Sequence, residues 1–179
     1  MPRAGRDERA WVRGAQAGSV SDLEALFRSH WPRAYRAAYL VVHDRAAAED
    51  IAQEAFLAAV RALDTFDRRR PFGPWLHRIV VNRAIDWSRA RALRSEVGDE
   101  ALAAARARPE PPPQALSPGI ASALAALAPD QRAVVVLRYL LEYTPGEIAR
   151  MLDLPRGTVN SRLRRGLDAL QRRLPEEEV

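Results

Sequence analysis

A predicted pair of helices at residues 144–174 constrains the fold of this chain more than any other stretch. Thr144 and Glu147 have the spacing of a capping box, in which each side chain accepts a hydrogen bond from the backbone N–H of the other residue. Pro145 then occupies the first helical position, and Ile148, Met151 and Leu152 form the buried side of the helix. Because Pro155 disfavours helical geometry at the residue before it, this helix must end within Asp153–Pro155. A second helix follows directly, so the stretch is predicted to be a helix-turn-helix.

The second helix is predicted to be amphipathic and basic. Apolar residues recur at i, i+4, i+8, i+11 and i+15, at Val159, Leu163, Leu167, Leu170 and Leu174. At about 100° per residue the opposite side carries polar residues: Ser161, Arg164, Arg165, Asp168 and Arg172. Asn160 and Arg162 flank the apolar stripe. Arg and Asn near the start of such a helix suit the DNA major groove; the alternative is a solvated arginine face on an ordinary helical hairpin.

The first half of the chain also has helical periodicity. A short helix is expected at residues 7–17, and a longer one is expected to start at Ser19, Ser21 or Asp22 and to kink or loosen at Pro32. The aromatic residues of this longer helix are expected in the core, with a base-stacking surface as the alternative. Residues 45–63 form a further helix whose predicted core side is Ile51, Ala55, Phe56, Val60 and Leu63. Asp50, Gln53, Glu54 and Leu57 lie toward another side. They form either a solvated acidic patch or a docking surface for a positively charged partner.

A loop rich in arginine separates this helix from the next one. Residues 64–73 carry Arg68, Arg69 and Arg70 between Phe66 and Phe72, and either contact phosphates or are solvated. From Pro74 to about Arg94 the predicted helix buries Leu76, Ile79, Val80 and Trp87. Asn82, Asp86 and Arg89 stand at i, i+4 and i+7 and share one polar face.

The composition changes sharply after this helix. Residues 96–119 are rich in proline, acidic and small residues and contain little that could form a core, which predicts a linker; a short helix at residues 101–106 is an alternative. Ser117 starts helix again, with Ile120, Leu124 and Leu127 on its inner side. A further helix at Pro129 buries Val134, Leu137 and Leu141. No stretch is convincing as a strand, so the fold class is all-α, with two small helical domains at residues 1–95 and 118–179 joined by a linker at residues 96–117.

Composition excludes several classes of protein. All 28 basic residues are arginine and the formal net charge is +5, but this arginine bias is weak evidence for nucleic-acid binding because a GC-rich genome also produces it. The chain has no cysteine, and its three histidines are scattered, so no disulfide, metal site or cofactor is expected. The N-terminus lacks the apolar core of a signal peptide and no apolar run could cross a bilayer, which favours a cytoplasmic location. No set of residues typical of a nucleic-acid enzyme occurs in a suitable context.

Five features in one order resemble a known family. They are the segments AEDIAQEAF and FGPWLHRIVVNRAIDWSR, the proline-rich linker, and the segments LAPDQRAVVVLRYL and TPGEIARMLDLPRGTVNSRLRRGL. This order is similar to that of the extracytoplasmic-function sigma factors, the smallest members of the bacterial sigma-70 family. The resemblance implies a sigma region 2 domain that binds RNA polymerase and opens the minus-10 element, tethered to a sigma region 4 domain that reads the minus-35 element.

The resemblance also implies roles for individual residues. Asp50, Gln53 and Glu54 match the surface that docks on the clamp helices of the largest polymerase subunit, and the second domain of the family contacts the flap of the second-largest subunit. The residues that match the segment near the minus-10 strand are Asn82, Arg83, Asp86 and Arg89, and the loop at residues 64–72 resembles one that captures a flipped base. The start of the recognition helix is matched by Arg156, Thr158, Asn160, Ser161, Arg164 and Arg165.

The family implies further partners and leaves one alternative. Many members bind an anti-sigma factor, so one is expected here besides polymerase core and promoter DNA. Asn160 and Leu167 stand where basic residues are common in the family, which predicts fewer or different minus-35 contacts. The alternative function is a stand-alone helix-turn-helix transcriptional regulator, which needs no polymerase and usually binds a palindromic site.

Overall fold

The computed structural model describes residues 4–96 and 116–174, which are all helical or connecting segments. No strand occurs in either of these two ranges. Most of the predicted linker, and the alternative short helix at residues 101–106, lie outside them. The all-α fold class predicted from the periodicity is confirmed.

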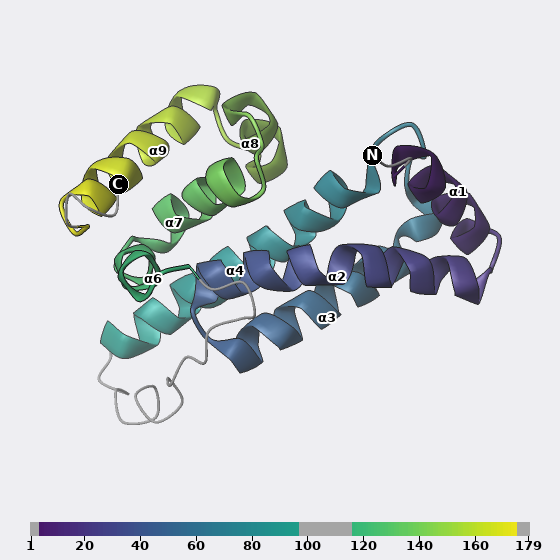
Figure 1. Ribbon diagram of the computed structural model, residues 1–179, viewed down its shortest axis with the longest axis horizontal. Helices are drawn as coiled ribbons and strands as arrows, with labels where there is room; N and C mark the ends of the chain where they lie inside the picture. The colour runs from purple at the N-terminus through teal and green to yellow at the C-terminus, as the bar shows by residue number, and fades with distance from the viewer. Residues whose placement is uncertain (1–3, 97–115, 175–179) are drawn as a thin grey trace.

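The residues before the linker form a bundle of long helices, here called the first unit. It contains α1 (Ala4–Gln16), α2 (Val20–Val42), α3 (Arg45–Arg61), the short 3-10 turn η1 (Leu63–Thr65) and α4 (Phe72–Glu96). Figure 1 shows α2, α3 and α4 running side by side along the long axis, with α1 packed near the start of α2. The last helix begins at Phe72, two residues before the predicted start at Pro74, so the preceding loop is shorter than expected.

Small side chains allow these helices to pack closely. The buried side of α2 includes Ala34, Ala37 and Ala38, and the buried side of α3 includes Ala48, Ala52, Ala55 and Ala59. Helices that face each other through alanine approach more closely than helices that face each other through larger side chains. Leu76, Val80 and Val81 of α4, which are fully buried, complete this core.

Local sequence signals set the ends of the helices. Ser19, one of the three starts that the sequence left open, caps α2 by accepting a hydrogen bond from the Asp22 N–H. The helix continues through Pro32 and ends at His43, which adopts the left-handed conformation with a φ of 52°. Asp44 then caps α3 by accepting from the Ala47 N–H at 3.0 Å.

The residues after the linker form a second unit of shorter helices. It contains α6 (Pro118–Ala125), α7 (Pro129–Val135), a π-helical turn η2 (Val136–Leu140), α8 (Pro145–Leu152) and α9 (Arg156–Gln171). Ser117 caps α6 by accepting from the Ile120 N–H. Val134, Leu137 and Leu141 are buried as the sequence predicted.

The two units pack against each other instead of standing apart. α2 and α4 of the first unit contact α6, α7, η2 and α8 of the second, and the buried apolar residues of both units form one cluster. Arg132 of α7 joins them through polar contacts: its guanidinium donates to Val41 O of α2 at 2.6 Å, to Ala125 O at 2.6 Å and to Leu127 O at 2.8 Å. Burial lowers the pKa of Arg132 to about 10, so the side chain remains charged at neutral pH. We call this arrangement of the two units the closed arrangement.

The first helix braces the loop between α3 and α4. The Gln16 side chain donates to Leu63 O at 2.7 Å and to Phe66 O at 3.1 Å. Glu8 accepts from the Phe72 N–H at 2.9 Å, and its other carboxylate oxygen lies 3.1 Å from Nε2 of His30. These contacts, chiefly the one with His30, lower the pKa of Glu8. Both ends of the loop are therefore held by α1.

Two apolar residues lie at the surface instead of in the predicted core. Val60 is 41% exposed because it stands three residues after the exposed Leu57 and shares its outward face. Phe27 is 40% exposed, with its ring stacked on Trp31 at 4.9 Å between centroids. The prediction of Val60 and of every aromatic residue of α2 as core was therefore wrong at these positions.

Candidate nucleic-acid and protein interfaces

The helix-turn-helix predicted at residues 144–174 is present. Thr144 Oγ1 accepts from the Glu147 N–H at 3.3 Å, and the Glu147 carboxylate accepts from the Thr144 N–H at 2.8 Å, which completes the capping box. The hydrogen bond that the Glu147 carboxylate accepts from the Thr144 hydroxyl at 2.7 Å, followed by the one from the Thr144 N–H, lowers the pKa of Glu147. Asp153 ends α8 in the left-handed conformation with a φ of 53°, and α9 begins after Pro155. The turn between the two helices is therefore short and its geometry is defined by these residues.

The packing of α9 decides which of its side chains face outward. Val159 is fully buried and Leu163 is 8% exposed, whereas Leu167 and Leu170 are half-buried. Gly166 lies close to α7, because a Cβ built there would stand 2.9 Å from Val135 Cγ2. This anchoring leaves Arg156, Asn160, Arg164 and Arg165 exposed on the outer side, with Thr158 half-buried.

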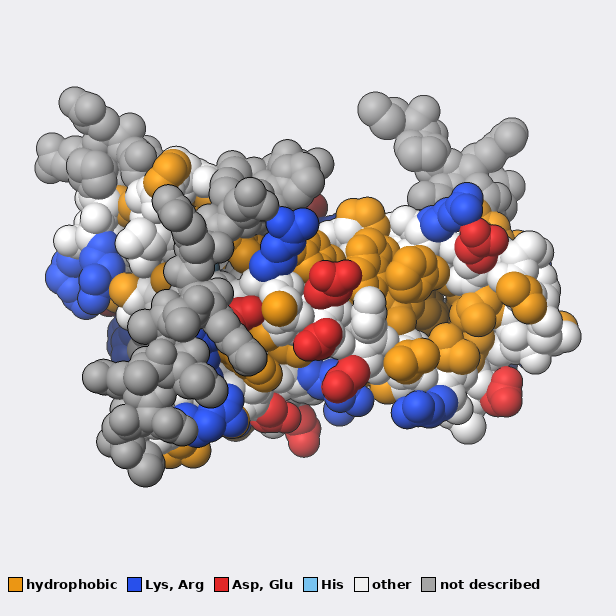
Figure 2. Space-filling view, turned by 90° about the horizontal axis from the view of Figure 1, so that it is seen from below, with side chains coloured by type: hydrophobic (Ala, Val, Ile, Leu, Met, Phe, Trp, Pro, Cys, Tyr) orange, Lys and Arg blue, Asp and Glu red, His pale blue; other side chains and the backbone are white. Residues whose placement is uncertain are grey.

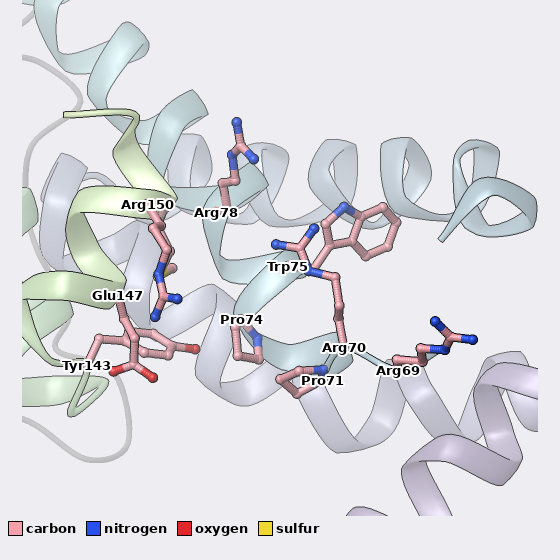
Figure 3. A pocket seen from close by; sticks show the side chains of 10 residues that line it. Arg69, Arg70, Pro71, Pro74, Trp75, Arg78, Tyr143, Glu147 and Arg150 are labelled. Carbon is pink, nitrogen blue, oxygen red and sulfur yellow. The ribbon is translucent and has the colours of Figure 1, made fainter. Parts of the chain in front are cut away.

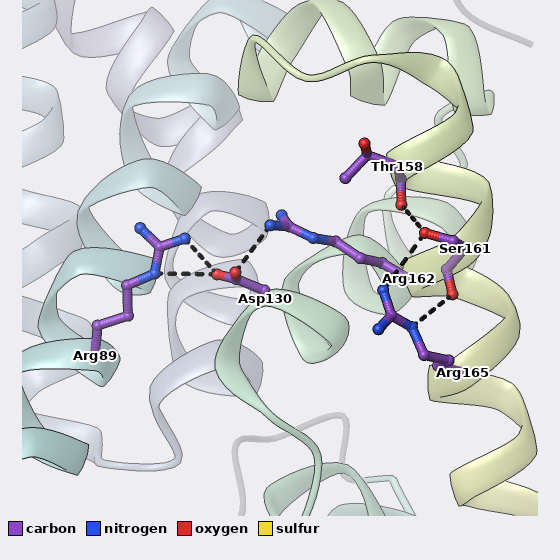
Figure 4. Close-up of polar contacts among 6 residues, drawn as sticks. All are labelled: Arg89, Asp130, Thr158, Ser161, Arg162 and Arg165. Atoms are coloured by element: carbon purple, nitrogen blue, oxygen red, sulfur yellow. Dashed lines mark hydrogen bonds and ion pairs between the residues drawn. The ribbon is translucent and has the colours of Figure 1, made fainter.

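Two residues of the outer face of α9 are engaged with their own helix (Figure 4). The Ser161 hydroxyl donates to Thr158 O at 2.9 Å. Arg165 Nε donates to Ser161 O at 3.2 Å, and its Nη2 lies 3.4 Å from Ser161 Oγ. The helix therefore offers Arg156, Asn160 and Arg164 directly, whereas Ser161 and Arg165 must exchange these bonds to contact a ligand.

Asp130 links α9 to the first unit (Figure 4). Its Oδ1 accepts from Arg89 Nη2 at 2.7 Å and from Arg89 Nε at 3.1 Å, and its Oδ2 lies 3.0 Å from Nη2 of Arg162. Arg162 therefore contacts a carboxylate within the protein and has a structural role. Nothing in the sequence pattern identified Asp130, which reads as an ordinary acidic residue in the first turn of a helix.

The polar face predicted on α4 is only partly free. Asp86 and Arg89 are exposed, and Asn82 and Arg83 are half-buried. Arg83 Nη1 pairs with Glu54 Oε2 at 2.7 Å, and Arg89 pairs with Asp130. Two of the four predicted residues thus make ion pairs in the closed arrangement, one of them across the two units.

A second candidate surface lies on α2 and α3. Asp50, Gln53 and Glu54 are exposed along α3, followed on the same side by Leu57, which is 55% exposed. Val60 and Phe27 continue this surface, and Phe27 and Trp31 both lie against Phe56, with ring centroids 4.9 and 5.9 Å from it. Figure 2 shows one face of the molecule on which hydrophobic side chains gather beside acidic ones. We call these residues of α2 and α3 the acidic-apolar face; the sequence identified its acidic part and Leu57 but not Val60 or Phe27.

The buried histidines are not arranged to bind a metal. Burial lowers the pKa of His43 to about 4 and that of His77 to about 3, so both side chains are neutral at neutral pH. His77 Nδ1 lies 2.7 Å from the Tyr143 hydroxyl of the second unit. In residues 4–96 and 116–174, no three His, Asp or Glu side chains cluster as metal ligands would, and no helix is long and apolar enough to cross a membrane.

Comparison with known proteins matches both units to one family. Residues 26–94 match the description Sigma-70 region 2 and residues 119–170 match Sigma-70, region 4. The chain is 37% identical over 176 residues to the ECF RNA polymerase sigma factor SigW of Bacillus subtilis, covering 91% of this chain and 92% of that protein. It is 34% identical over 171 residues to the ECF RNA polymerase sigma factor SigL of Mycobacterium tuberculosis, covering 93% and 97%. The chain belongs to the extracytoplasmic-function sigma factors.

Solved structures of other proteins share the fold of this ECF sigma factor. The structure of CnrH in complex with the cytosolic domain of CnrY has a TM-score of 0.68 at 29% identity and covers 93% of this chain and 96% of that chain. Sigma factor RpoE of Bartonella quintana, solved with the anti-sigma factor NepR, has the same fold with a TM-score of 0.69. In this ECF sigma factor, α2 to α4 correspond to region 2, and α6 to α9 correspond to region 4.

Proposed function

We propose that this ECF sigma factor binds bacterial RNA polymerase core and directs it to promoters through the minus-10 and minus-35 elements. The observation that carries the proposal is the presence of both sigma-70 regions in one chain, with α9 exposing Arg156, Asn160 and Arg164 on region 4. A stand-alone regulator would need only the helix-turn-helix. The proposed role is that of an initiation factor and not of an enzyme, and it places the protein in the cytoplasm with polymerase.

The acidic-apolar face is the proposed docking surface for polymerase core. Asp50, Gln53 and Glu54 supply negative charge and hydrogen-bonding groups, while Leu57 and Phe27 supply exposed apolar area. Complementary charge sets the orientation and rate of association, and buried apolar anchors supply most of the affinity. Docking there requires Glu54 to exchange its ion pair with Arg83, which stands among the residues proposed for the minus-10 element.

The promoter contacts are divided between the two regions. Asn82, Arg83, Asp86 and Arg89 of α4 are proposed to face the minus-10 strand. Arg156, Thr158, Asn160, Ser161, Arg164 and Arg165 are proposed to contact the minus-35 duplex. Because Arg89 is held by Asp130 of region 4 at 2.7 Å, Arg89 must exchange this ion pair before it can contact DNA. The proposed boundaries of the two domains are residues 1–95 and 118–179, with the linker at residues 96–117.

Two of the similar structures are complexes with a second protein, which supports a proposal about the partners of this chain. CnrH was solved together with the cytosolic domain of CnrY, and RpoE of Bartonella quintana was solved together with the anti-sigma factor NepR. We therefore propose that this chain also has an anti-sigma partner. The acidic-apolar face is the surface that such a partner would compete for, since it carries the largest exposed apolar side chains of α3.

Run-off transcription tests the proposed function. Core polymerase supplied with this chain should start transcription at promoters that core alone does not use. Asp50→Arg and Glu54→Arg should weaken the affinity for core without changing helical content. Arg61→Ala, an exposed change on the same helix, is the control. Specific DNA binding to a palindromic site by the chain alone, with no effect on core polymerase, would favour the stand-alone regulator.

A further inference from the structure

A hollow lies where the start of α4 meets α8 (Figure 3). Its cavity volume is about 330 Å³, within the size range of small-molecule sites. Residues of region 2 form one wall and residues of region 4 form the other. The lining residues used below are Arg69, Arg70, Trp75, Arg78, Glu147 and Arg150.

The hollow is complete only in the closed arrangement. Arg70 and Trp75 come from the loop and first turn of α4, whereas Glu147 and Arg150 come from α8. Tyr143, also in the lining, meets His77 of α4 through the 2.7 Å hydrogen bond between the two regions. Separation of the regions would therefore divide the site into two halves.

The lining of the hollow is positively charged, which favours an anionic ligand. Four arginines line the hollow, and Figure 3 shows the Arg70 guanidinium beside Trp75 and the Arg150 guanidinium beside Glu147. Only one carboxylate, that of Glu147, is in the lining. Both hydrogen bonds of that carboxylate go to Thr144, one to its N–H and one to its hydroxyl. Arg69, Arg70 and Arg78 form no ion pair with any carboxylate in the described part of the chain. Guanidinium groups left unpaired around one cavity match phosphate in both charge and geometry.

The hollow also has a flat aromatic wall. Trp75 is half-buried and packs on Phe66 with ring centroids 4.6 Å apart, which fixes its orientation. Pro71 and Pro74 add rigid apolar surface beside it. A fixed aromatic ring next to guanidinium groups suits a ligand with a planar base and a phosphate chain.

We propose that this hollow binds a nucleoside polyphosphate, with the base at Trp75 and the phosphates among Arg69, Arg70, Arg78 and Arg150. The ligand binds only when regions 2 and 4 are closed, so by linkage it shifts the population toward the closed arrangement. Occupation of the hollow therefore opposes the release of Arg89 that promoter binding requires. All residues of the proposed site are present in the free chain, so ligand binding there does not depend on the proposed promoter contacts.

Titration calorimetry on the full chain tests binding directly. Adenosine diphosphate is the probe, with adenosine and pyrophosphate as partial ligands. Adenosine diphosphate should bind more tightly than pyrophosphate, and adenosine should bind least. Arg70→Ala from region 2 and Arg150→Ala from region 4 should each weaken binding about 10-fold or more, the loss expected for a charge-assisted hydrogen bond. Arg173→Ala removes the same charge from the exposed far end of the chain and should leave binding unchanged.

A second measurement separates this site from general attraction of anions. The chain has no cysteine, so spin labels at Val20→Cys and Arg172→Cys report the distance between the two regions without interference. Adenosine diphosphate should increase the closed fraction in the parent chain and not in Arg150→Ala. Equal weakening of binding by Arg173→Ala, equal binding of pyrophosphate, or an unchanged distance distribution overturns the proposal. Binding of a single-stranded oligonucleotide through Arg70, with none of adenosine diphosphate, also overturns it and assigns the hollow to the promoter strand.

Discussion

Replacement of Arg132 by methionine should open the closed arrangement and destabilise region 4. The guanidinium makes one hydrogen bond to region 2, at Val41 O, and two within region 4, at Ala125 O and Leu127 O. Methionine keeps an unbranched apolar stem but is shorter than arginine and donates to none of these carbonyls. The residue is 8% exposed, so solvent screens these bonds little.

The size of each effect depends on whether the lost hydrogen bond joins the two regions or lies within region 4. A hydrogen bond to a charged donor contributes about 1.5 to 3 kcal/mol, so loss of the Val41 contact should lower the ratio of closed to open chains by about 10- to 150-fold. The two bonds within region 4, offset by the smaller desolvation cost of methionine, should lower the free energy of unfolding of that region by about 2 to 4 kcal/mol.

Two assays check the two parts of this prediction. The distance between labels at Val20→Cys and Arg172→Cys reports opening, and urea denaturation followed by circular dichroism reports unfolding. Arg138→Met is the matched control, since Arg138 is half-buried in the same segment and its hydrogen bond to Tyr143 O is 3.5 Å long. The reasoning fails if Arg132→Met keeps both the distance distribution and the urea midpoint of the parent chain.

Three further predictions concern DNA affinity, pH and helix packing. In holoenzyme, the Arg164→Ala and Arg165→Ala changes should each reduce the salt slope of promoter affinity by about 0.9 if the side chain contacts a phosphate. If the double variant binds the promoter like the parent chain at every salt concentration, both arginines are only a solvated face. Burial lowers the pKa of His43 to about 4 and that of His77 to about 3, so only the unfolded chain takes up protons at these residues as the pH drops below about 6.5. The free energy of unfolding should therefore fall by up to about 1.4 kcal/mol per pH unit for each of the two histidines. Acid titration of His43→Gln should show a shallower fall of the free energy of unfolding, and a slope equal to that of the parent chain would contradict this cause. Gly166→Ala should destabilise region 4 by about 1 to 3 kcal/mol, because the new Cβ would stand 2.9 Å from Val135 Cγ2. The control is Gly157→Ala in the same helix, where the new Cβ meets open space and the change should be neutral or stabilising in thermal denaturation. Equal melting temperatures for the two variants would count against this packing.

Local signals in the sequence predicted local structure well. The capping box at Thr144 and Glu147 is present, and so is the break before Pro155, because both depend on residues within one turn of each other. The outward position of Asp50, Gln53 and Glu54 followed from helical periodicity alone. Val60 was assigned to the wrong side because an apolar residue on a helix surface has the same signature as a core residue.

The contacts between the two regions could not be predicted in this way. Arg132 and Asp130 are separated by about 40 to 90 residues from Val41 and Arg89, and only the three-dimensional packing brings these groups together. A helical pattern with a single arginine is equally consistent with solvent exposure. The roles of Arg156, Thr158, Asn160, Ser161, Arg164 and Arg165 stay predictions, as do those proposed for α4 and α3.

The brace that α1 provides has a consequence for how proteins of this kind diversify. The match to Sigma-70 region 2 begins at residue 26, whereas Gln16 and Glu8, which hold the loop between α3 and α4, lie before it. A lineage that alters this leading segment changes how firmly the loop is held while every side chain proposed to contact DNA stays the same. Under the promoter contacts proposed for region 2, residues outside the matched segment can therefore change promoter choice through the loop that they hold.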